Sequence, residues 1–123
     1  MTKQPDVATE RRAHRRVRKQ IEMQGSPDAG GVVARMVTND LSIGGLHCVS
    51  TADFPEMTRL EVRLMLPLKN GADDAAEPVD LEAVVVRRQE YDSPDGEPRF
   101  ELALFFTGVE NGARERLARY LDG

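Results

Sequence analysis

The sequence is poor in the residues that build several classes of functional site. Its 123 residues include one cysteine, Cys48, two histidines, His14 and His47, and no tryptophan. A lone cysteine cannot form an internal disulfide, and one cysteine with two histidines is too few for a structural zinc site. We therefore expect neither a bound metal nor a resident cofactor.

Long apolar runs and an excess of positive charge are also lacking. The first ten residues, "MTKQPDVATE", do not contain the apolar centre of a signal peptide, and no apolar run approaches the roughly 18 residues that span a bilayer. The formal net charge is −4, so the chain as a whole is not a polycation of the kind that binds nucleic acid. These absences predict a cytoplasmic protein that neither inserts into a membrane nor binds DNA.

The motifs of common enzymes are absent as well. Neither Ser42 nor Ser50 lies in a G-x-S-x-G sequence, and the chain contains no H-E-x-x-H metal motif and no phosphate-binding G-x-x-x-x-G-K-[ST]. The glycine pair in "SIGG" precedes a strand-like segment rather than a helix, unlike a dinucleotide-binding turn. We therefore expect that the protein is not an enzyme.

What the sequence does contain is the pattern of one small domain. An apolar fraction of 40% and a charged fraction of 31% are typical of a globular protein with one hydrophobic core. After a polar tail at residues 1–9, which we expect to be flexible, apolar and polar residues alternate in short segments bounded by turn residues. Six such segments are predicted strands: 17–23, 32–37, 46–50, 59–68, 79–88 and 99–106.

The last segment changes from a strand period to a helical one. In residues 110–122, Ala113, Leu117, Tyr120 and Leu121 fall on one face of a helix. Short strands at regular spacing are typical of a small closed sheet. The predicted fold is therefore all-β with a terminal helix: a six-stranded antiparallel β-barrel followed by one C-terminal α-helix.

A basic run stands out against the acidic composition. In "ERRAHRRVRKQ", residues 10–20, six of the eleven residues are arginine or lysine. Such runs occur in solvated tails, in nucleic-acid sites and at membrane surfaces. Which of these applies here depends on whether another part of the chain cooperates with the run.

A second stretch, "NDLSIGGLHC" at residues 39–48, lies between two predicted strands. Asp40 and Ser42 are two residues apart, so in an extended chain their side chains face the same way. Gly44 and Gly45 permit positive φ angles or the close approach of another group. The stretch is therefore either a polar recognition site or an Asx-type turn that joins two strands.

Two motifs emerge when the stretches are combined. Arg12 and Arg16 form R-x-x-x-R just before the first predicted strand. Asp40, Ser42 and Gly45 form D-x-S-x-x-G just after the second. With the "ERR" opening, "DLSIGGL", "VVVRR", "FELALFF" and the terminal helix, the chain resembles the PilZ family, bacterial receptor domains for cyclic di-GMP. The resemblance implies a single bacterial, cytoplasmic domain at residues 10–123, with an arginine-rich arm at 10–16, a barrel at 17–108 and a helix at 110–122.

The resemblance also implies which residues bind the ligand. In the family, an arginine directly before the first motif accompanies binding of an intercalated pair of ligand molecules, and Arg11 holds that position. A second register of the motif, Arg11 with Arg15, is open, but we prefer Arg12 with Arg16 because Val17 then begins the strand directly. The predicted site comprises Arg11, Arg12, Arg16, Asp40, Ser42 and Gly45, with secondary positions at Arg15, Asn39, Gly44, Val85 and Arg87.

One position departs from the family pattern. Some relatives place a large aromatic residue on the strand at 79–88, near a base of the ligand. This chain offers Val85 or Val86 there. We therefore do not expect base stacking from that strand.

The chemistry of these residue types suits cyclic di-GMP, which carries two phosphates and two guanines. A guanidinium donates two parallel hydrogen bonds to guanine O6 and N7 or to phosphate oxygens, and it also stacks on a purine. A carboxylate such as Asp40 accepts hydrogen bonds from guanine N1–H and N2–H. We expect Ser42 to donate to a phosphate or sugar oxygen, and Gly45 to leave room for the ligand.

The predicted function is a stand-alone cyclic di-GMP receptor. Ligand binding would order the arginine-rich arm and change the surface offered to an unidentified downstream protein. One alternative is a PilZ-fold adaptor that binds no nucleotide. Another is a small barrel that binds single-stranded nucleic acid, although an aromatic content of 5% and a negative net charge argue against it.

Overall fold

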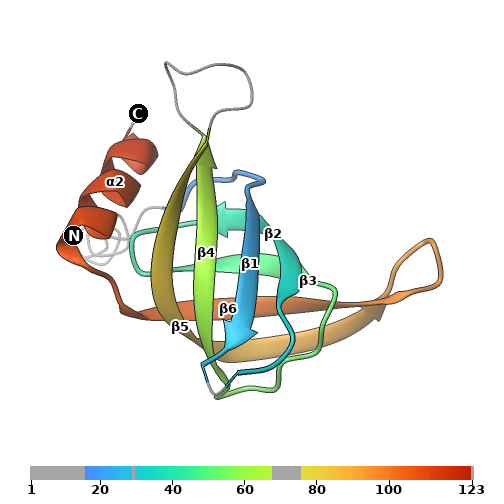
Figure 1. Cartoon of the computed structure of the whole chain (residues 1–123). Coiled ribbons are helices and arrows are strands. Elements are labelled where there is room, and N and C mark those ends of the chain that lie inside the picture. The colour runs from blue at the N-terminus through green and yellow to red at the C-terminus, as the bar shows by residue number, and fades with distance from the viewer. Residues whose placement is uncertain (1–15, 29, 68–75, 123) are drawn as a thin grey trace, which may run out of the picture.

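The structure, a computed structural model, describes residues 16–28, 30–67 and 76–122. In these residues six strands form a closed antiparallel barrel in the order β1-β2-β3-β6-β5-β4, and one helix, α2, packs outside it against β5 (Figure 1). The fold predicted from the sequence is therefore confirmed. The elements are β1 (Glu22–Pro27), β2 (Ala34–Leu41), β3 (Gly45–Ser50), β4 (Arg59–Pro67), β5 (Ala76–Asp92), β6 (Pro98–Gly108) and α2 (Asn111–Asp122).

The alternation of apolar and polar residues explains how the barrel is filled. On β4, Leu60, Val62, Leu64 and Leu66 are buried while the residues between them are mostly exposed. Successive side chains of a strand point to opposite faces, and the interior of a small barrel is filled by the inward set. On β6 the inward set continues with Phe100, Leu102, Leu104 and Phe106.

The helix α2 contacts the barrel through the apolar face that its sequence predicts. Ala113 and Leu117 are buried, and Tyr120 and Leu121 are partly buried against the core. The described part of the chain contains no helix with the length and hydropathy of a membrane span.

The first strand begins later than predicted. Regular pairing of β1 starts at Glu22 rather than at residue 17. Val17 forms only an isolated bridge with Leu41, in which each backbone N–H donates to the other's carbonyl oxygen at 2.9 Å. Four residues separate Val17 from Glu22, whereas three separate Leu41 from Val37, the partner of Glu22, so the ladder cannot stay in register.

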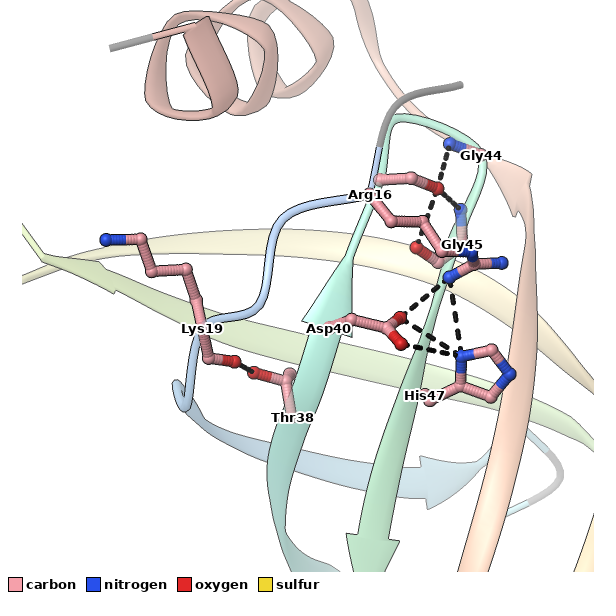
Figure 2. A network of polar contacts seen from close by, with 8 residues as sticks. Arg16, Lys19, Thr38, Asp40, Gly44, Gly45 and His47 are labelled. Atoms are coloured by element: carbon pink, nitrogen blue, oxygen red, sulfur yellow. Dashed lines mark hydrogen bonds and ion pairs between the residues drawn. The ribbon is translucent and has the colours of Figure 1, made fainter. Parts of the chain in front are cut away.

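A side chain closes this irregular part of the ladder. The backbone N–H of Ile21 donates to Thr38 Oγ1 at 2.9 Å. The Thr38 hydroxyl in turn donates to the carbonyl of Lys19 at 2.5 Å, a contact shown in Figure 2. Thr38 is fully buried, so its hydroxyl replaces a backbone partner that water cannot supply. The segment that carries Arg16 is thereby held against the end of β2.

The β5–β6 hairpin is longer than predicted. The strands were expected at 79–88 and 99–106, but β5 continues to Asp92 and β6 begins at Pro98, so the hairpin projects beyond the barrel (Figure 1). The residues at the end of β5 are mostly exposed and therefore lack the alternation that reveals a strand. A turn at 93–97 joins the two strands: Gly96 adopts a φ of 87° and its N–H donates to the Ser93 carbonyl at 2.8 Å.

Candidate functional site

A polar cluster on the outer face of the barrel joins the two sequence motifs (Figure 2). Arg16 Nη1 donates to Asp40 Oδ1 at 2.7 Å, across 24 residues of sequence. His47 Nδ1 lies 3.0 Å from Asp40 Oδ1 and 3.1 Å from Oδ2, so this nitrogen carries the proton that it donates to the carboxylate. The side chains of Arg16 and Asp40 are 50% and 23% exposed, so a ligand can reach both from solvent.

The Arg16–Asp40 contact is an open one. Within the described part of the chain, the polar contacts of Arg16 all pass through Nη1. An arginine has five N–H donors in a planar arrangement, so most of them remain available to a ligand. Arg16 Nη1 also lies 3.4 Å from His47 Nδ1. Because both nitrogens carry a proton in this arrangement, the contact is not a hydrogen bond.

Two β-bulges turn residues onto this outer face. On β2 the inward residues alternate through Met36 and Thr38, and continued alternation would place Asp40 inside. The register to β3 shifts between Thr38 and Asp40, so Asn39 is the extra residue and Asp40 lies opposite His47 on the outside. Asn39 itself is exposed. Bulges commonly redirect side chains next to functional sites.

The second bulge acts in the same way on β5. Val85 is fully buried, and Arg87 would share its inward direction if the strand were regular. The register to β6 shifts between Val85 and Arg87, so Val86 is the extra residue and Arg87 is exposed opposite Ala103. The prediction that Val85 contacts the ligand is therefore wrong, whereas Arg87 lies on the outer face.

The pairings define one row of residues across four strands, which we call the outer row: Asp40 on β2, His47 on β3, Ala103 on β6 and Arg87 on β5. Neighbouring strands lie about 4.8 Å apart, so the row spans roughly 14 Å. It carries a carboxylate at one end and a cation at the other, with the His47 ring and the methyl group of Ala103 between them.

The turn beside the outer row is built around Ser42. Ser42 is 2% exposed; its hydroxyl donates to the Gly45 carbonyl at 3.1 Å and accepts hydrogen bonds from the N–H groups of Gly44 and Gly45 at 3.2 Å. Ser42 and Asp40 therefore do not share an exposed face, because β2 ends at Leu41 and the chain turns. The Ser42 hydroxyl therefore shapes the turn, and its direct contact with a ligand stays a prediction.

Gly45 is required by a neighbouring strand. A Cβ atom on Gly45 would lie 2.2 Å from the carbonyl oxygen of Leu104 on β6, a distance that no side chain tolerates. The Gly44 carbonyl accepts the N–H of Phe106 at 2.9 Å and fixes the other side of the turn to the same strand. Gly45 was expected to leave room for the ligand, but the backbone of β6 occupies that space. A glycine is needed here because β6 packs directly against it.

The remaining predicted residues, Arg11, Arg12 and Arg15, lie outside the described residues, as do the tail at 1–9 and the rest of the arm before Arg16. His47 is the functional candidate that sequence reasoning missed. The signal was available in the hairpin register, because His47 is the outward partner of Asp40 across the turn at 42–45.

A surface cavity of about 540 Å³ lies away from this cluster, over β1, β4 and β5. Its lining includes Glu61, Asp80, Glu82 and Glu110, with Arg63 the one cation among its lining residues. A carboxylate-rich lining repels an anionic ligand. The cavity is therefore not a candidate for the ligand that the motifs indicate.

The fold and the cluster together define a small β-barrel domain that presents polar residues from two motifs on its outer surface. A model of the PilZ domain family matches residues 10–123, and the chain therefore belongs to the PilZ family. No protein with a curated description matches the sequence.

Solved structures share this fold. The Bacillus subtilis inhibitor of motility, MotI/DgrA, is similar with a TM-score of 0.67 and 22% identity over 87% of this chain and 47% of that one. The PilZ domain of Escherichia coli YcgR, solved with cyclic di-GMP, gives 0.58 and 18% over 89% and 87%. YcgR in complex with cyclic di-GMP gives 0.62 and 21% over 91% and 45%, so this chain spans about half the length of MotI and of YcgR.

Proposed function

We propose that this PilZ domain is a cyclic di-GMP receptor and that the ligand binds over the outer row. The observation that carries the proposal is the contact of Arg16 with Asp40 at 2.7 Å, because it joins the two motifs on a face open to solvent. YcgR, which has the same fold, has been solved with cyclic di-GMP. No chemical step is assigned to the site, so the proposed role is that of a receptor and not of an enzyme.

Each residue has a distinct proposed role. The two oxygens of Asp40 accept guanine N1–H and N2–H, which frees Arg16 to donate to a phosphate or to guanine O6 and N7. Ser42, with Gly44 and Gly45, holds the turn that places these two side chains. Arg87 supplies positive charge at the far end of the outer row.

The arginines before Arg16 extend the proposed site. Arg15, Arg12 and Arg11 directly precede Arg16, and each extended residue spans at most about 3.5 Å, so they are within reach of a ligand held at Arg16. We propose that the ligand, as one molecule or as an intercalated pair with Arg11 on an outer guanine, orders residues 10–16 across the outer row. The changed surface would then be recognised by a separate protein.

Calorimetric titration of the whole chain with cyclic di-GMP tests the proposal. We expect saturable binding, with much weaker binding of cyclic di-AMP, because adenine lacks the N1–H and N2–H groups that Asp40 would accept. Folded protein that releases no heat at tens of micromolar ligand would favour the adaptor that binds no nucleotide. Binding of a labelled single-stranded oligonucleotide, undisturbed by cyclic di-GMP, would favour the nucleic-acid alternative.

Two further measurements address the arm and the ligand number. In NMR spectra, addition of cyclic di-GMP should shift the amide signals of residues 10–16 together with those of the outer row. If the wild type binds two ligands per chain, Arg11→Ala should lower the number toward one. Saturation of the wild type at one equivalent would contradict the intercalated pair, and unchanged signals at 10–16 would contradict the ordering of the arm.

A further inference from the structure

An aromatic side chain stands exposed on the outer face next to the cluster. Phe105 on β6 is 54% exposed, whereas Phe100 and Phe106 on the same strand belong to the core. The alternation of β6 places Phe105 outward, so it adds little to the packing of the barrel. A large aromatic group left in water contributes little to folding, so the Phe105 ring is available for a binding role.

The register of the sheet locates Phe105 beside the outer row. It lies two residues along β6 from Ala103 and on the same face, so their Cα atoms are roughly 7 Å apart. Its cross-strand partners are Gly45 on β3 and Val84 on β5. Gly45 has no side chain that could pack against the ring from β3.

The neighbours of Phe105 give this part of the surface an apolar and cationic character. Val86, the extra residue of the β5 bulge, is 50% exposed. Arg87 follows it and is exposed on the outer row. A flat apolar ring next to a valine and an arginine suits the face of one base, while Asp40 and Arg16 at the other end suit the polar edge of another base and a phosphate.

We propose that Phe105 is the stacking platform for a purine ring of the bound ligand, with Val86 extending its apolar edge. The inference rests on the proposed function, because it assigns one contact within that same site. It also explains how the surface offers base stacking although β5 carries only valines at 84–86. Stacking on an aromatic side chain tolerates either purine, so this contact supplies affinity and leaves the choice of base to Asp40.

Conservative variants separate ring stacking from simple apolar burial. Phe105→Tyr keeps the ring and should bind cyclic di-GMP within about twofold of the wild type. Phe105→Leu keeps an apolar side chain without the ring and should bind roughly 10- to 100-fold more weakly, the usual range for loss of a base–aromatic stack. The matched control is Tyr91→Leu, an exposed aromatic on the β5–β6 hairpin that pairs with Arg99 and lies outside the outer row.

A spectroscopic measurement gives an independent readout. The chain contains no tryptophan, so Phe105→Trp introduces a single tryptophan at the proposed contact. We expect saturating cyclic di-GMP to quench its emission, and to leave the emission of Tyr91→Trp unchanged. Circular dichroism melting of each variant verifies that it folds.

The outcomes distinguish this inference from the proposed function. If the wild type binds but Phe105→Leu binds equally well and Phe105→Trp is not quenched, the platform is wrong and the receptor function stands. If the folded wild type does not bind cyclic di-GMP, the proposed function is wrong, and so is the stacking role of Phe105. Weakened binding by Phe105→Leu together with quenching in Phe105→Trp would establish the stacking contact.

Discussion

Two arginine–aspartate pairs on the barrel surface differ in how completely they are closed. Arg63 on β4 donates through Nε and Nη2 to both oxygens of Asp80 on β5, at 2.8 and 3.1 Å. Arg16 reaches Asp40 through one nitrogen only, and that carboxylate is shared with His47. A closed bidentate pair satisfies the groups it contains, whereas an open pair can exchange partners with a ligand. The open pair is the one that joins the two sequence motifs.

Two neighbouring arginines on β5 show the same contrast. Arg88 donates to both oxygens of Asp53 and also lies 5.4 Å from the centroid of the Phe100 ring. These bonds lower the pKa of Asp53, chiefly through the hydrogen bond from Arg88. Arg87 is exposed on the outer row instead. Two consecutive residues of β5 therefore differ in role: Arg88 is a structural arginine, and Arg87 is a candidate ligand contact.

The largest expected effect concerns the scaffold that holds the open pair. In Gly45→Ala the new Cβ would lie 2.2 Å from the Leu104 carbonyl oxygen, so β3 and β6 must separate. Overpacking costs roughly 1–3 kcal/mol, and we expect the upper end because the clash is with backbone. Urea unfolding measures the loss. The control, Gly112→Ala in α2, meets only a flexible arginine tip at 3.8 Å and should not destabilise the protein. Equal stability of the two variants would contradict the role given to Gly45.

The next effect is on binding and tests the open pair directly. Arg16→Ala should weaken cyclic di-GMP binding by about one to two orders of magnitude, since a bidentate contact is worth roughly 1–3 kcal/mol and about 1.4 kcal/mol is tenfold. Part of the loss should shrink at high salt, which screens the phosphates. The matched control is Arg63→Ala, which opens the closed pair and should leave affinity unchanged. Titration of both variants at two salt concentrations checks this. Similar losses of affinity in both variants would show that the open and the closed pair do not differ in ligand binding.

A somewhat smaller effect is expected at the carboxylate. Asp40→Ala should weaken binding by about tenfold, because lost base contacts outweigh the relief of repulsion between Asp40 and an anionic ligand. Asp40→Asn should recover little, because its amide turns a donor toward the guanine donors. Asp80→Ala is the control and should bind as the wild type does. Tighter binding by Asp40→Ala would mean that Asp40 does not contact guanine, and the ligand assignment would have to be abandoned.

The sequence predicted the barrel because alternation survives wherever a strand has one buried face. Leu60 to Leu66 on β4 and Phe100 to Phe106 on β6 show this most clearly. The start of β1 and the end of β5 could not be predicted, because the first depends on the buried hydroxyl of Thr38 and the second on exposed residues without alternation. The first depends on a contact across 17 residues of sequence, and the second on pairing with β6 within the hairpin.

The site was predicted in part, and the two bulges explain the rest. Arg16 and Asp40 were found through their motifs and do lie together. The choice of Val85 failed because alternation along β5 turns it into the core, and only the bulge at Val86 brings Arg87 outward. A bulge is set by pairing with another strand, and a single sequence does not display that pairing.

The smallest expected effect is on stability and tests the closed pair. The hydrogen bonds of Arg63 lower the pKa of Asp80, with the charge of Arg63 acting in the same direction. A folded-state pKa below the unfolded value of about 3.9 means that the pair stabilises the protein above that pH and loses this contribution as the pH falls through the folded pKa. Asp80→Asn should therefore be slightly less stable than the wild type at pH 7, and the difference should vanish in strong acid. The effect is small because the pair is exposed to solvent. Urea unfolding of both proteins at neutral and acidic pH checks this, and a difference that persists unchanged in acid would show that Asp80 acts through packing and not through the ion pair.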